Sequence, residues 1–177
     1  MGLYNDQGRV LISPSRLRAW RDCELRWHAV YVEGREIVPT PSMAFGKAMH
    51  SALEAFHKGR WLGRPVPLDG LEGIFDETLR HEAEAGDLDL GSQQATFEKA
   101  ARGLLGAYLE RFATEEVAGA ELHLSAPLTD TSGQDLGADL VGILDLVADG
   151  RVIDLKTAAR ASDAFSVTLA HQVQLEA

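Results

Sequence analysis

Three residues near the end of the chain have types and spacing that suit metal-assisted hydrolysis: Asp145, Asp154 and Lys156. They belong to the stretch 140–157, LVGILDLVADGRVIDLKT, in which Asp149-Gly150 separates two apolar halves. An Asp-Gly between two such runs predicts a hairpin, because a two-residue type I′ turn needs φ > 0 at both central positions. We therefore expect two antiparallel strands that carry these three polar side chains.

The register of this hairpin predicts that the charged groups lie together. With a two-residue turn, Ala148 pairs with Arg151, and Asp145 falls directly opposite Asp154. Opposed side chains lie about 4.5–5.5 Å apart, so two carboxylates there repel each other. A divalent cation between them removes that repulsion, and Lys156, on the same face as Asp154, is suited to positioning an attacking water. The alternative is an ion-pair network on an exposed sheet face.

A histidine on a predicted helix is a third candidate ligand. Apolar residues recur at helical spacing over 43–58, and His50 lies on the face beside them, one turn after Gly46. A histidine beside a helix core is more often packed or solvated than bound to a metal. Carboxylates with one imidazole nevertheless suit Mg²⁺ or Mn²⁺, so His50 joins Asp145 and Asp154 as a candidate ligand.

The remaining elements follow from hydrophobic periodicity and from Gly and Pro. The sequence Ser13-Pro14-Ser15 predicts a helix start with Ser15 as N-cap, and helical spacing continues to Tyr31. Helices are also expected over 70–85, 93–117 and 164–177, with a half-buried strand over 121–126. We expect a single domain over 1–177: a lead and helix (1–42), a core helix (43–58), a helical insertion (59–118), and a sheet with the site hairpin and the start of a last helix (119–177).

The composition is that of a soluble globular protein from a reducing compartment. Hydrophobic residues make up 45% and charged residues 25% of the 177 positions, which places the chain in the ordinary globular class. The single cysteine, Cys23, excludes an internal disulfide, and we expect it to be buried. No apolar run approaches about 18 residues and no signal-peptide pattern opens the chain, so we expect a cytoplasmic protein without a membrane partner.

The charge is negative overall and uneven along the chain. The net charge of −10 argues against broad, nonspecific binding to nucleic acid. Residues 1–66 nevertheless carry 10 Lys and Arg against 6 Asp and Glu, whereas residues 67–177 carry 7 against 21. One interpretation is a local phosphate-binding surface with Ser15, Arg16 and Arg21 as contacts. The other is a core-packed helix with a solvated basic face.

The chain resembles the RecB-like branch of the PD-(D/E)XK nucleases in five segments. These are SPSRLRAWRDCELRW (13–27), FGKAMHSALEAFH (45–57), GILDLV (142–147), VIDLKT (152–157) and HQVQLEA (171–177). Asp-x-Lys alone is common by chance. Gly-x-x-x-His, Gly-x-x-Asp, Asp-x-Lys and a glutamine-bearing helix, in this order, form a specific set.

The resemblance implies a fold and a role for each matching residue. The fold would be the α+β, restriction-endonuclease-like αβββαβ core, with a helical N-terminal part and its last strand missing from a sequence that stops inside a helix. His50, Asp145 and Asp154 match the metal ligands of these nucleases. Lys156 matches the lysine that orients or activates the attacking water.

The last matching segment implies a substrate contact. Gln172 matches the glutamine of the Gln-x-x-x-Tyr motif, which helps to hold the substrate. Glu176 stands where the Tyr is expected, so Gln174, whose Tyr would follow Ala177, is the other candidate.

The resemblance further implies the activity, the cofactors and the partners. The activity would be exonuclease cleavage of DNA with Mg²⁺ or Mn²⁺, in a complex with a helicase or other nuclease subunits. An iron–sulfur cluster of the kind some relatives hold needs four thiolates, so this chain, with Cys23 alone, does not support one. The alternatives are a noncatalytic nucleic-acid- or protein-binding subunit of a recombination or CRISPR-adaptation complex, and an acidic helical adaptor.

Overall fold

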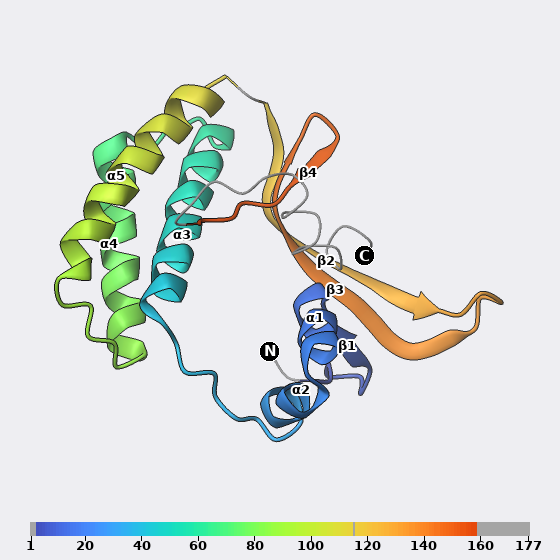
Figure 1. Cartoon of the computed structure of the whole chain (residues 1–177). Helices are drawn as coiled ribbons and strands as arrows, with labels where there is room; N and C mark the ends of the chain where they lie inside the picture. Colours follow the sequence, from blue (N-terminus) through green and yellow to red (C-terminus); the bar gives the residue numbers. More distant parts are fainter. Residues whose placement is uncertain (1–2, 115, 159–177) are drawn as a thin grey trace. The chain divides into compact units, whose positions relative to one another are not determined.

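A computed structural model of the chain describes residues 3–114 and 116–158 (Figure 1). Within these residues lie five helices and a four-stranded mixed sheet, so the α+β class expected from the sequence is confirmed. The elements, in chain order, are β1 (Val10–Ile12), α1 (Pro14–Asp22), α2 (Glu24–Tyr31), α3 (Pro41–Trp61), α4 (Leu68–Ala85), α5 (Gln93–Phe112), β2 (Val117–Thr129), β3 (Asp135–Ala148) and β4 (Arg151–Ile153). The predicted helix over 164–177 lies outside the described residues.

The contacts divide the described chain into two compact units. The helical unit comprises Val38–Leu122 and Leu144–Thr157 and contains α3, α4 and α5. The N-terminal unit contains residues 3–37 and 123–143, and so α1 and α2. The strands β2 and β3 each contribute residues to both units. In the sheet the order is β1-β3-β2, and β4 also pairs with β3.

The first helix of the N-terminal unit starts earlier than the sequence predicts and ends sooner. Its N-cap is Ser13, whose Oγ accepts from the N–H of Arg16, with Pro14 in the first turn, so the assignment of the cap to Ser15 is wrong. The reason is that a proline, which lacks an N–H, fits the first helical position well. The predicted single helix is divided at Cys23, whose backbone is extended. Cys23 is also exposed, which corrects the expectation of a buried thiol.

Three helices build the core of the helical unit. The helix α3 begins at Pro41 with Thr40 as N-cap, its side chain accepting from the N–H of Met43. It lies beside α4 and α5 (Figure 1), and its apolar side chains pack with theirs in one core. The largest fully buried side chains in this core are Leu71, Phe75 and Leu105. Since α3 is anchored along its length, it is a rigid support for the polar residues on its other side.

The strand β2 has less burial than its alternating sequence predicts. Leu122 is 38% exposed and Leu124 is 52% exposed, so the expected half-buried face is wrong. The core of the helical unit is filled from α3, α4 and α5 instead. The helix α5 ends at Phe112, five residues before the predicted end at 117, because β2 begins at Val117.

The predicted hairpin over 140–157 is confirmed. Asp149 and Gly150 have φ of 50° and 69°, both in the left-handed region that a type I′ turn requires. The strands β3 and β4 pair antiparallel, with Ala148 opposite Arg151. Beyond β4, Leu155 packs against the core of the helical unit, so the chain leaving the hairpin is held against α3.

No helix of the described residues is long and apolar enough to cross a membrane.

Candidate metal centre

Three side chains from three different elements converge in the helical unit: His50 of α3, Glu121 of β2 and Asp145 of β3. One ligand atom from each lies within 4.8 Å of the other two. Nδ1 of His50 on the helix lies 3.7 Å from Oδ1 of Asp145 on the sheet. All three side chains are partly buried, which brings two acids and an imidazole together where water screens their charges less than at an open surface.

The backbone of the hairpin orients Asp145. This residue directly precedes the fully buried Leu146 on β3, and its side chain is 12% exposed. The N–H of Leu155 donates a hydrogen bond of 2.6 Å to Oδ2 of Asp145. The two carboxylate oxygens therefore differ, because Oδ2 accepts from the backbone while Oδ1 faces His50.

Glu121 is the member of the group that sequence analysis missed. Its backbone has φ of 51°, a left-handed conformation that is uncommon for a residue other than glycine and that recurs at functional sites. Burial raises the pKa of the Glu121 carboxyl, and the negative charges of Asp145 and Glu54 raise it further. A group of acids held together in this way is one that a cation stabilises.

Asp154 and Lys156 lie outside this group. The register places Leu146 opposite Ile153, as predicted, but that is the last pair of the ladder. The next residue, Asp154, is exposed and forms an ion pair of 2.5 Å with Lys156. The expected opposition of Asp145 and Asp154 is thus replaced by the hydrogen bond between Leu155 and Asp145. The metal-binding role of Asp154 and the catalytic role of Lys156 stay predictions.

Gly46 explains how the segment that follows β4 lies against α3. A Cβ built on Gly46 would meet Oγ1 of Thr157 at 3.5 Å, an ordinary van der Waals distance. The absence of a large side chain one turn before His50 therefore gives room to Thr157, the residue after Lys156.

The other predicted substrate contacts lie elsewhere in the chain. Ser15, Arg16 and Arg21 belong to the N-terminal unit. Arg16 is buried, donates to the carbonyl oxygen of Leu11 at 2.5 Å and lies over the ring of Tyr31. The assignment of these three residues to substrate binding stays a prediction. Gln172 and Gln174 lie outside the described residues.

The donors of the group fit a divalent cation. Ligand atoms about 2.1 Å from one Mg²⁺ in an octahedral shell lie roughly 3 to 4.2 Å from one another. The limit of 4.8 Å within the group is close to that range before any adjustment of the side chains. Two carboxylates suit Mg²⁺ and Mn²⁺, and the imidazole favours Mn²⁺ of the two. His50, Glu121 and Asp145 therefore form a suitable site for such an ion.

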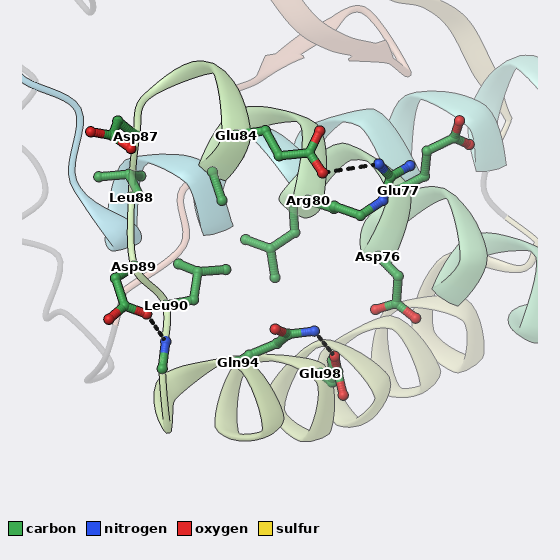
Figure 2. A pocket seen from close by; sticks show the side chains of 13 residues that line it. Asp76, Glu77, Arg80, Glu84, Asp87, Leu88, Asp89, Leu90, Gln94 and Glu98 are labelled. Carbon is green, nitrogen blue, oxygen red and sulfur yellow. Dashed lines mark hydrogen bonds and ion pairs between the residues drawn. The ribbon is translucent and has the colours of Figure 1, made fainter.

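A hollow of about 710 Å³ on α4 and α5 is lined mainly by acidic and apolar residues (Figure 2). Its lining contains six acids and one basic residue, Arg80, which is paired with Glu84 at 3.2 Å. No residue of the metal-centre group lines it. The negative charge of this lining repels anions such as phosphate.

A mixed sheet that carries an acid beside an Asp-x-Lys segment, with a histidine supplied by a neighbouring helix, has the residue types that metal-assisted hydrolysis uses. The family model of the PD-(D/E)XK nuclease superfamily matches residues 11–177. The chain belongs to this superfamily. No curated protein and no solved structure gives a significant match.

Proposed function

We propose that the protein is a metal-dependent deoxyribonuclease of the RecB-like branch, acting as an exonuclease on DNA. The observation that carries this proposal is the convergence of His50, Glu121 and Asp145 within 4.8 Å, from elements far apart in the chain. Family membership supports the reaction class, and the motifs Gly-x-x-x-His, Gly-x-x-Asp and Asp-x-Lys support the RecB-like branch.

In this proposal the site consists of metal ligands, a backbone N–H that orients one of them, and a lysine that acts on the phosphate. His50, Glu121 and Asp145 hold one Mg²⁺ or Mn²⁺, and Leu155 fixes the rotamer of Asp145 through its N–H. The bound cation supplies Lewis-acid activation of the phosphodiester. Lys156 supplies a positive charge that stabilises the negative charge developing on the phosphate. For this, the ammonium group of Lys156 leaves its ion pair with Asp154 and binds the phosphate of the substrate instead.

The proposal is tested by cleavage of end-labelled linear DNA, single- and double-stranded, with Mn²⁺, Mg²⁺ or EDTA. We expect cutting with either metal and none with EDTA. The variant K156A should cut at least about 100-fold more slowly, the scale of losing one electrostatic donor. The matched control is K99A, which removes an exposed lysine of α5. Cutting that persists in EDTA, or that K156A leaves unchanged, would contradict the assignment.

The exonuclease part of the proposal has its own measurement. A covalently closed circular single strand offers no end, whereas a linear strand of the same sequence does. We expect only the linear strand to be degraded. Degradation of both at similar rates would identify an endonuclease instead.

A noncatalytic subunit is the second candidate, and two observations favour it. Lys156 is engaged in an ion pair with Asp154, and the net charge is −10. In this role the protein would bind DNA or a partner subunit, such as a helicase, within a recombination or CRISPR-adaptation complex. DNA binding by the wild-type chain without cleavage in any of the metals would select this candidate.

A further inference from the structure

We propose that Lys58 binds a phosphate of the nucleic acid beside the metal centre, an inference that rests on the proposed nuclease function. Lys58 matches none of the motifs that define the site. Its position on α3, its ion pair and the charges around it lead to this role.

The position follows from the ridge of residues that runs along α3 from His50. Residues four apart lie above one another on a helix, so His50, Glu54 and Lys58 form one row, about 12 Å long at 1.5 Å per residue. The side chains become more exposed along this row, at 29%, 33% and 48% respectively. Lys58 therefore stands at the solvent-facing end of the row that begins at the metal centre.

The same row connects Lys58 to the metal centre. Nδ1 of His50, at the start of the row, lies 3.7 Å from Oδ1 of Asp145, and Lys58 stands about two turns further along α3. A strand that is bound at the metal and continues along α3 therefore reaches the ammonium group of Lys58.

The ion pair that Lys58 forms is weak enough for a phosphate to replace it. Lys58 binds Glu54 one turn earlier on α3, the favourable order of acid before base on a helix. An exposed pair of this kind contributes little to stability, so a phosphate competes with Glu54 readily. Arg60, two residues later, is engaged differently: it donates to the carbonyl oxygen of Phe112 at 2.7 Å and lies over the ring of Phe56.

The need for such a contact follows from the acidic surroundings. The metal centre itself carries two carboxylates, and the net charge of the chain is −10. A nucleic-acid strand that extends from the scissile bond needs positively charged side chains near its phosphates to remain bound. Lys58 offers one on the row that starts at His50.

The test measures how binding of a fluorescein-labelled oligothymidylate depends on salt, by anisotropy in EDTA so that the probe stays intact. We expect a steep fall in affinity for the wild-type chain between about 50 and 200 mM NaCl. In K58Q the slope of log K against log salt should become shallower by about 0.7, the contribution of one phosphate contact on a single strand. K58R should keep the wild-type slope, and E54Q should bind more tightly because Glu54 no longer competes. The matched control, K99Q, should behave as wild type.

Cleavage by the same proteins separates this inference from the proposed function. If the wild type cuts DNA, K58Q should raise KM several-fold with kcat nearly unchanged, because the contact is made equally in the ground state and the transition state. A K58Q slope equal to that of wild type, or a wild type that does not bind the probe, would overturn the role of Lys58. A wild type that binds the probe with the expected Lys58 dependence but never cuts would overturn the nuclease function alone.

Discussion

The N–H of Leu155, two residues past the last pair of the hairpin ladder, donates to Oδ2 of Asp145 at 2.6 Å. This bond couples the acid on β3 to the chain that leaves β4. Because Leu155 also packs against the core of the helical unit, the orientation of Asp145 depends on the packing of that core. The N–H of Leu155 thus links the orientation of Asp145, a candidate metal ligand, to the core of the helical unit.

The turn that creates this arrangement gives the first prediction. Gly150 has φ of 69°, and a Cβ there would meet no atom within 4 Å, so the effect of a side chain is conformational alone. We expect G150A to lower the free energy of unfolding by about 1 kcal/mol, since alanine disfavours the left-handed region. Urea unfolding checks this. D149N, which introduces a residue that tolerates the same region, should leave the free energy of unfolding unchanged. An equal decrease in both variants would show that the left-handed backbone does not determine the effect.

Gly46 gives a prediction with opposite results for two substitutions. A methyl group there meets Thr157 at an ordinary distance, so G46A should leave stability unchanged or raise it by up to about 1 kcal/mol through helix propensity. G46L should instead displace Thr157, and with it Lys156, and so reduce cleavage while α3 stays folded. The measurements are urea unfolding and cleavage rate. Normal cleavage by a folded G46L would show that this contact does not position the Asp-x-Lys segment.

The buried histidine of α3 predicts how stability depends on pH. Burial lowers the pKa of His57 to about 4, with a smaller contribution from the charge of Arg60, and its Nε2 is hydrogen-bonded to Oη of Tyr108 at 2.8 Å. Between about pH 6.5 and pH 4 the unfolded chain therefore binds more protons than the folded one. The stability from this histidine is present near pH 7 and is lost as the pH falls through that window, by up to roughly 3 kcal/mol.

Urea unfolding at several pH values checks the role of His57. The variant H57N should lose most of the decline between neutral and acidic pH that the wild type shows. The matched control is H81N, which changes an exposed histidine of α4 and should retain the decline. A wild type whose stability is flat over this window would exclude a buried neutral histidine.

Local features of the fold were predictable because local chemistry decides them. Asp149-Gly150 determines a two-residue turn by its backbone preferences, and the register of the neighbouring pairs follows from it. The helices α3, α4 and α5 were located from periodicity, with their ends displaced by a few residues. The break at Cys23 was missed because no glycine or proline marks it.

The composition of the candidate site was predictable only in part. His50 and Asp145 stand in recognisable motifs, and the structure brings them within 3.7 Å. Glu121 has no such motif: its proximity to both arises from the pairing of β2 with β3 and the packing of α3, which join residues far apart in the chain. The alternation around Glu121 indicated a strand, but only its left-handed backbone in the folded chain distinguishes it from its neighbours.

We expect His50, Glu121 and Asp145 to hold one divalent cation. Crystals of the protein soaked in Mn²⁺ and measured at the manganese absorption edge test this directly, because anomalous scattering locates the ion without assumptions about activity. One strong peak should lie within bonding distance of all three side chains and be absent from crystals of E121Q prepared in the same way. A peak bound elsewhere, or a peak that E121Q leaves unchanged, would contradict it.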